Sequence, residues 1–183
     1  FGLEIERLGF DGLSVPDHLM TGDGATMECL TTTTALAEAT EDVYLYPKTI
    51  NNPLRHGPYL AKAMATLDNI SDGRLKLGMG AGWKADEAIA YGYDWDDAPT
   101  RLRELEETIE LMKRLWTEDE VTFVQSAANR LHPAVHHVRG GHHVGSRPGV
   151  AHRLPAEKLE GFVVGHVAAG EHSAVTVTGV FAE

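Results

Sequence analysis

The chain has 183 residues, enough for one domain with a substantial core, because a domain of this size buries roughly 70% of the surface that its unfolded chain exposes. Its 16 basic and 27 acidic side chains give a net charge of −11, which repels nucleic-acid phosphates and anionic membranes and argues against both as partners. Cys29 is the only cysteine and no apolar run approaches the roughly 18 residues that a membrane span needs, so we expect a cytoplasmic protein without disulfides.

Apolar periodicity predicts alternating helices and strands in the first two thirds of the chain. The helices have apolar residues at three- and four-residue spacing and are expected at 1–8, 28–40, 57–70 and 100–116. The strands are short apolar runs, expected at 10–15, 43–50 and 74–82, the last of which runs into a glycine-rich loop. This alternation favours parallel strands with right-handed crossovers, and therefore an α/β fold. Because Phe1 already lies within a helical pattern, we expect a segment to precede it.

Three polar or glycine-rich segments follow the three predicted strands. They are Asp17–His18, Thr49–Asn52 and Gly78–Trp83. In α/β folds, ligands bind at the C-terminal ends of parallel strands. We therefore expect these three loops to meet on one rim.

The character of the sequence changes after Phe123. Residues 1–123 carry 11 basic and 23 acidic side chains, whereas residues 124–183 carry 5 and 4. Eight of the ten histidines lie in this second part, and its segment 161–181 is strand-like. We treat 124–183 as an unassigned tail, rich in His, Gly and Val.

Several segments together resemble the luciferase-like monooxygenase family. They are IERLGFDGLSVPDHL, RHGPYLAKAMATLDNISDGRLKLGMGAGW and EAIAYGY, followed by a long acidic helix that ends in LW. The likeness covers 1–123 and is greatest to the deazaflavin-dependent branch. It implies a (β/α)8 barrel that binds FMN or the deazaflavin coenzyme F-420 at its C-terminal rim. Because such a barrel takes ~250 residues, the expected fold is α/β: a partial or truncated (β/α)8 TIM-type barrel with an unassigned, β-rich C-terminal tail.

Asp17 and His18 place a carboxylate beside an imidazole at the end of the first predicted strand. An imidazole titrates near neutral pH and can exchange a proton with a substrate while hydride moves at a flavin ring. The alternative is a turn, in which Asp17 bonds its own backbone and His18 fills the loop. In the deazaflavin branch an Asp-His pair at this position lines the coenzyme site. The resemblance therefore implies His18 as the catalytic proton donor or acceptor, with Asp17 as its catalytic neighbour at the ring.

Thr49, Ile50 and Asn51 stand at the end of the second predicted strand. Many members of the family have a non-proline cis peptide bond here, behind the flavin ring, and we expect it at Thr49–Ile50. The resemblance implies that all three residues bind the cofactor. An Asn-rich turn before Pro53 is the alternative interpretation.

Charged residues flank this segment. Lys48 and Arg55 are expected to supply positive charge for an anionic coenzyme. We expect His56 to cap or pack the helix at 57–70, because a helix start leaves four N–H groups unpaired.

Glycines and one tryptophan follow the third predicted strand. Gly78 and Gly80 would let the backbone approach a planar ring or a phosphate, because no Cβ intrudes. The spacing through Gly82 is not that of the dinucleotide fingerprint. Trp83 is expected beside the cofactor. Sugar-phosphate dehydrogenases of the deazaflavin branch have a glutamate in its place, which argues against a sugar-phosphate substrate.

The histidine pairs His136–His137 and His142–His143 suggest a metal site in the tail. No cysteine accompanies them, and adjacent histidines of a regular strand rarely face one ion. We therefore expect no metal.

The resemblance, together with the three rim segments, implies a flavin- or deazaflavin-dependent oxidoreductase that transfers hydride or activates oxygen on a small organic substrate. We expect a homodimer. The alternative is a truncated, non-catalytic relative that acts as a dimeric binding or structural module, since half a barrel exposes strand edges and apolar surface that must be covered.

Overall fold

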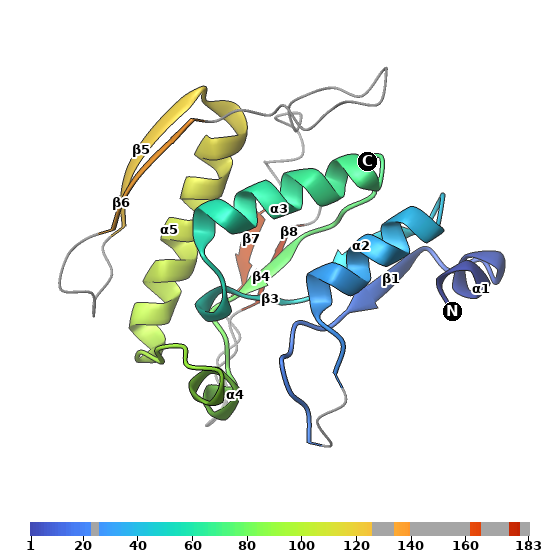
Figure 1. Cartoon of the computed structure of the whole chain (residues 1–183), viewed down its shortest axis with the longest axis horizontal. Helices are drawn as coiled ribbons and strands as arrows, with labels where there is room; N and C mark the ends of the chain where they lie inside the picture. Colours follow the sequence, from blue (N-terminus) through green and yellow to red (C-terminus); the bar gives the residue numbers. More distant parts are fainter. Residues whose placement is uncertain (23–25, 126–133, 140–161, 166–175, 180–183) are drawn as a thin grey trace.

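The computed structural model describes residues 1–22, 26–125, 134–139, 162–165 and 176–179, and the fold is that of these residues (Figure 1). Most of the predicted tail at 124–183 lies outside them. The division between the two parts of the chain therefore stays a prediction.

The four helices predicted from apolar spacing are all present, with ends within two residues of the expected ones. Two of them begin at a carboxylate cap: Glu28 accepts the N–H of Thr31 at 2.7 Å and Asp97 that of Thr100 at 2.9 Å. Gly9 follows the first helix with φ of 79°, as a glycine after a helix C-terminus commonly does. The helices are α1 (Gly2–Arg7), α2 (Cys29–Ala39), α3 (Gly57–Ile70), a short α4 (Ala85–Ala90) and α5 (Ala98–Thr117), with the 3-10 helix η1 (Asn52–Leu54) before α3.

The predicted strands are present but shorter. The expected strand at 43–50 is broken at Lys48–Thr49, and that at 74–82 is reduced to an isolated bridge at Leu75 and three residues from Gly78. The strands of the described residues are β1 (Gly12–Val15), β2 (Tyr44–Pro47), β3 (Ile50–Asn51), β4 (Gly78–Gly80), β5 (Glu120–Gln125), β6 (Ala134–Arg139), β7 (Phe162–Gly165) and β8 (Thr176–Gly179).

The first strands pair in parallel, as the alternation of strands and helices predicted. β1 pairs with β2 with Leu13 opposite Leu45, and Leu45 bridges in parallel to Leu75. β3 continues from β2 and pairs in parallel with β4, with Ile50 opposite Met79. The order is thus β1, then β2 with β3, then β4, and the α/β class is confirmed.

The later strands do not extend this parallel arrangement. β8 pairs antiparallel with β4, β7 pairs antiparallel with β8, and β5 and β6 form a separate antiparallel pair. In a (β/α)8 barrel neighbouring strands are parallel. A barrel-type arrangement is therefore represented among the described residues by β1 to β4 alone, and the partial barrel stays a prediction.

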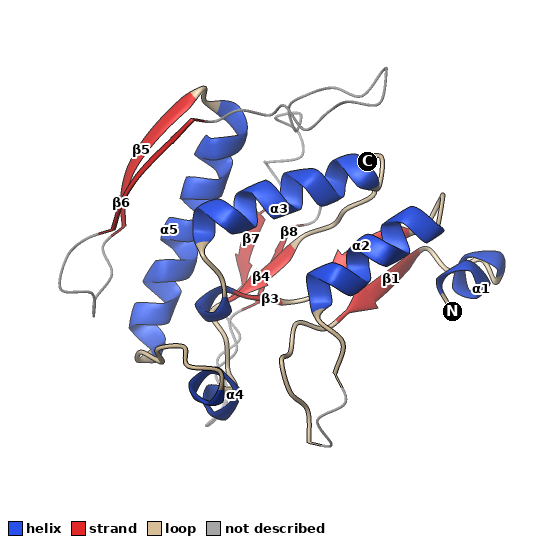
Figure 2. Ribbon diagram, in the orientation of Figure 1, coloured by secondary structure: helices blue, strands red, loops and turns tan. Residues whose placement is uncertain are grey.

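The core lies between these strands and the helices that cover them. α2 packs on β1, β2 and α3, and α3 packs on α5 (Figure 2). None of the helices in the described ranges has the length and hydropathy of a membrane span. The largest buried apolar side chains come from both layers: Leu13, Leu45, Ile50, Leu77 and Met79 from the strand side, and Leu60, Met64, Leu67, Leu105, Leu111, Met112 and Trp116 from α3 and α5.

Candidate functional site

The three predicted loops meet at the C-terminal ends of the parallel strands. The backbone N–H of Asn51, in β3, donates to Asp17 Oδ2 at 2.8 Å. The rings of His18 and Trp83 lie edge to face, with centroids 5.8 Å apart and an interplanar angle of 79°. A Cβ added to Gly82 would lie 2.6 Å from Asn51 Oδ1. The loops after β1, β3 and β4 are therefore in mutual contact, as their positions after the strands predicted.

Asp17 is an internal residue of this rim. Its side chain is buried, Oδ2 accepts the N–H of Asn51 and Oδ1 pairs with Arg55 Nη2. The same Nη2 lies 3.2 Å from Glu28 Oε1 at the start of α2. Burial raises the pKa of Asp17, while Arg55 and the Asn51 N–H act against that rise.

Arg55 is thus an ion-pair partner of Asp17 and Glu28, and its expected role toward an anionic coenzyme stays a prediction. Lys48 is exposed at the break between β2 and β3. His56 occupies the N-cap position of α3, as expected, but its side chain makes no capping hydrogen bond.

His18 pairs with Glu87 of α4 and not with its neighbour Asp17. Its Nδ1 lies 2.8 Å from Glu87 Oε2, and Glu87 Oε1 accepts the backbone N–H groups of Leu19 and of Met20, the latter at 3.0 Å. Glu87 is fully buried, whereas His18 is 22% exposed. Burial alone would raise the pKa of Glu87, but its hydrogen bonds from His18, Leu19 and Met20 lower it below 4.5.

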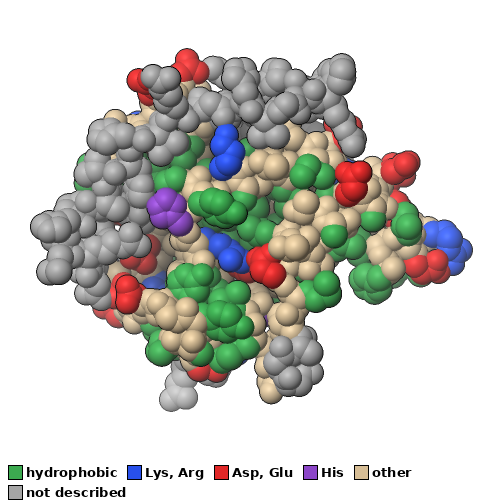
Figure 3. All heavy atoms as spheres, viewed as in Figure 1, with side chains coloured by type: hydrophobic (Ala, Val, Ile, Leu, Met, Phe, Trp, Pro, Cys, Tyr) green, Lys and Arg blue, Asp and Glu red, His purple; other side chains and the backbone are tan. Residues whose placement is uncertain are grey.

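Aromatic residues occur just before and just after α4, near the loop that carries His18. Trp83 is 51% exposed and Tyr91 donates its hydroxyl to Leu19 O at 2.9 Å. Figure 3 shows apolar side chains gathered over α4. The exposed members of this group are Trp83, Ile89, Tyr91 and Tyr93.

A non-proline cis peptide bond stands directly before the segment from Thr49 to Asn51, one bond earlier than expected: it is Lys48–Thr49 and not Thr49–Ile50. Ile50 is fully buried, and Asn51 and Asn52 are 5% exposed. The side-chain oxygens of both asparagines have no hydrogen-bond partner among the described residues. Two buried acceptors are thus unsatisfied next to the rim, where a bound group can supply a donor.

The glycines after the third predicted strand are divided between strand and loop. Gly78 and Gly80 lie in β4 and are buried, so they belong to the sheet rather than to the expected loop. Gly82 has φ of 78° and no room for a Cβ. Arg101 of α5 donates from Nε to Ala81 O at 3.0 Å and thereby holds this segment in place.

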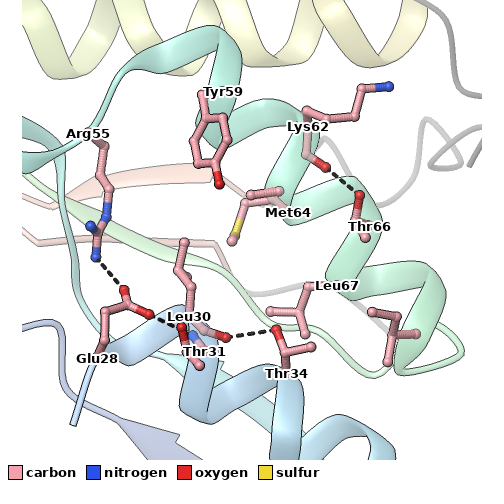
Figure 4. Close-up of a pocket in the computed structure, with 12 residues that line it drawn as sticks. Glu28, Leu30, Thr31, Thr34, Arg55, Tyr59, Lys62, Met64, Thr66 and Leu67 are labelled. Atoms are coloured by element: carbon pink, nitrogen blue, oxygen red, sulfur yellow. Dashed lines mark hydrogen bonds and ion pairs between the residues drawn. The ribbon is translucent and has the colours of Figure 1, made fainter.

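A groove of about 600 Å³ lies between α2 and α3 and adjoins the rim only at Arg55, the partner of Asp17 (Figure 4). Arg55 and Glu28 close one end of it, and Tyr59 and Lys62 of α3 line its side. His18, Trp83 and Glu87 do not line it. We therefore place the candidate site at the strand ends, where the titratable and unsatisfied groups converge.

No group of three or more potential metal ligands occurs within the described residues. His136 and His137 belong to β6, of which only the backbone is described, and His142–His143 lies outside the described residues.

Sequence reasoning missed one residue of the candidate site, Glu87, whereas Gly82 belongs to the Gly78–Trp83 segment that was expected on the rim. Glu87 was hidden because an acid in the first turn of a helix, in a chain with 27 acids, is typical of a solvated surface. One signal was available: the family-like segment EAIAYGY begins at Glu87, directly after the glycine-rich loop.

Comparison with known proteins gives a consistent result. Residues 1–180 match the model of the family described as luciferase-like monooxygenase. An F420-dependent glucose-6-phosphate dehydrogenase of Amycolatopsis mediterranei is 32% identical over 127 residues, which are 67% of this chain and 38% of that protein. The chain thus spans little more than a third of the length of this curated relative.

Two solved structures resemble the fold. An F420-dependent secondary alcohol dehydrogenase, in complex with an F420-acetone adduct, superposes with a TM-score of 0.62 and 25% identity over 69% of this chain and 39% of that one. The oxygenating constituent of 3,6-diketocamphane monooxygenase from Pseudomonas putida, in complex with FMN, has a TM-score of 0.63 and 18% identity, over 74% of this chain and 36% of that one. At that identity the likeness concerns the fold alone.

Proposed function

The chain belongs to the luciferase-like monooxygenase family, and we propose on this basis that it is part of an oxidoreductase that binds coenzyme F-420 or FMN at the strand-end rim. The reaction is hydride transfer, or oxygen activation, on a small organic substrate. Coenzyme F-420 is the better supported cofactor, because the 32% identical relative is F420-dependent and the 25% identical structure carries an F420 adduct.

One observation supports the proposal most: the loops after β1, β3 and β4 converge on His18, a partly exposed imidazole. The surroundings fit a planar polar ring. Asn51 and Asn52 offer unsatisfied acceptor oxygens, and Gly82, where a Cβ would meet Asn51 Oδ1, lets the loop after β4 pack closely against Asn51. Thr49, Ile50, Gly78 and Gly80 complete the proposed cofactor-binding set around them.

The chain's own residues would divide the work between binding and proton transfer. A bound deazaflavin or flavin supplies the hydride chemistry. His18 exchanges a proton with the substrate. Asp17, buried and paired with Arg55, ties the loop after β1 to β3 and so acts on the site by holding it in shape.

Trp83 supports a substrate that is not a sugar phosphate. Its half-exposed indole stands beside His18 and offers an apolar face without charge. Phosphate recognition in proteins relies on cationic side chains and backbone N–H groups. A neutral organic substrate suits this wall better.

The test is a titration of the purified full chain with F-420 and, separately, with FMN, followed by absorbance and fluorescence. We expect saturable binding of F-420 in the micromolar range, the usual range for metabolite-sized ligands. A Trp83→Glu variant serves as a comparison for substrate choice, because it introduces the glutamate found in sugar-phosphate dehydrogenases of this branch. Absence of binding for both coenzymes would refute the proposal.

A second candidate is a non-catalytic binding module. The antiparallel pairing of β8 with β4 favours it, because this edge of β4 would carry a parallel neighbour in a complete barrel. Such a module would bind neither coenzyme. The homodimer and the cytoplasmic location expected from the sequence belong to both proposals, and sedimentation of the purified chain tests the former.

A further inference from the structure

Glu87 forms three hydrogen bonds with the loop after β1. Oε2 meets His18 Nδ1 at 2.8 Å, and Oε1 accepts the N–H groups of Leu19 and Met20. The carboxylate is fully buried on α4, so solvent does not share these bonds. The loop that carries His18 is therefore attached to α4 through one side chain.

The protonation of Glu87 decides which nitrogen of His18 carries a hydrogen. Glu87 Oε1 accepts the backbone N–H groups of Leu19 and Met20, and these two bonds favour the ionised carboxylate, which only accepts hydrogen bonds. Nδ1 of His18 must then be the donor. A neutral imidazole carries one N–H, so Nε2 is left as the acceptor.

We propose that Glu87 is a positioning residue that fixes His18 in the Nδ1–H tautomer and so makes Nε2 the nitrogen that takes up the proton released by the substrate. The hydride leaves to the oxidised coenzyme of the proposed function, on which the reaction itself rests. The tautomer is a property of the chain alone and is measurable without coenzyme.

A merely structural role for Glu87 would consist of anchoring Leu19 and Met20. The variant Glu87→Gln separates the two roles. Its amide oxygen still accepts both backbone N–H groups, while its NH₂ group faces Nδ1 of His18 and donates to it. The hydrogen of a neutral His18 must then move to Nε2, and the tautomer inverts while the anchor remains.

The tautomer is read from the ring-nitrogen signals of the coenzyme-free full chain, labelled with ¹⁵N-histidine, at a pH where His18 is neutral. His18 is assigned among the ten histidines by the signals that disappear in His18→Gln. Asp86→Asn is the matched control, since Asp86 lies on the same helix but is exposed and pairs with Lys84 at 2.7 Å. We expect Nδ1–H in the wild type and in Asp86→Asn, and Nε2–H in Glu87→Gln.

The wild-type spectrum alone can overturn the proposal, because an Nε2–H signal would contradict it even where Glu87→Gln does not fold. A folded Glu87→Gln that keeps Nδ1–H would overturn it as well. In turnover, Glu87→Gln should lose about 10²- to 10⁴-fold in kcat, the usual contribution of a general acid or base, with coenzyme affinity unchanged. A chain that binds no coenzyme would refute the proposed function and leave the tautomer result standing.

Discussion

Replacing Arg55 by methionine would leave the buried carboxylate of Asp17 without its cationic partner. Asp17 is 3% exposed and would retain the N–H of Asn51 as its other hydrogen bond. Removing one member of a buried ion pair costs about 3–5 kcal/mol, because the remaining charge stays desolvated. We expect Arg55→Met to lower the free energy of unfolding by that amount at neutral pH.

The loss should depend on pH in a defined direction. Burial already raises the pKa of Asp17 above 3.8, and without Arg55 the folded-state pKa rises further. The folded state then binds a proton that the unfolded state releases, so stability falls as the pH rises through the interval between these two pKa values. By the same linkage, the difference in the free energy of unfolding between wild type and Arg55→Met should be small near pH 4 and largest at neutral pH.

Urea unfolding followed by tryptophan fluorescence at several pH values measures this difference. Arg7→Met is the control, because the Arg7–Glu4 pair is exposed and its loss should leave the midpoint unchanged. The double variant Asp17→Asn/Arg55→Met has no buried charge at this position. Its loss in the free energy of unfolding should therefore be smaller than the sum of the losses in the two single variants. An Arg55→Met variant as stable as Arg7→Met, or a loss independent of pH, would show that Asp17 is not an internally paired carboxylate.

Three further variants or reagents test other parts of the structure. Gly82→Ala should lower the free energy of unfolding in urea by more than ~1 kcal/mol and should bind F-420 more weakly. Gly9 has a similar φ but open space for a Cβ, so Gly9→Ala should bind F-420 normally. Equal behaviour of the two variants would contradict the close approach at Gly82. Cys29 is fully buried and burial raises its pKa to about 12, so iodoacetamide should label it only after unfolding, and mass spectrometry showing rapid labelling of the native chain would exclude this. Trp116→Phe removes the buried hydrogen bond from the indole N–H to Ala61 O at 2.9 Å. It should lower the free energy of unfolding by about 1–3 kcal/mol in the same urea assay. An unchanged free energy of unfolding would mean that this bond is not formed.

The helices were predictable because each carries its own periodicity. α3 and α5 have apolar residues at helical spacing along one face, and their ends coincide with the expected ones to within two residues. The strands were predicted at the right places but too long. An apolar run such as 43–50 indicates that the residues are buried. It does not show which of them pair with a neighbouring strand, so it does not reveal the break at Lys48–Thr49.

The site was predictable in position and not in connectivity. Strand ends of a parallel sheet gather at one edge, and this rule alone brings His18, Asn51 and Trp83 together. Adjacency in sequence placed Asp17 and His18 together at the ring, but the two side chains are bound by Arg55 and by Glu87, from segments 38 and 69 residues away. Such long-range pairs leave no local pattern in the sequence.

The later strands show the same limit. β8 joins β4 from about a hundred residues further along the chain and in antiparallel orientation. Local patterns in the tail indicated strands, whereas the partner and direction of a strand depend on tertiary contacts.

A fluorescence titration of F-420 with the full wild-type chain, beside Gly82→Ala and Gly9→Ala, is the decisive measurement for the coenzyme site. We expect saturable binding to the wild type and to Gly9→Ala, with clearly weaker binding to Gly82→Ala. No binding to the wild type, or equal binding to all three chains, would contradict a coenzyme site at the ends of β1, β3 and β4.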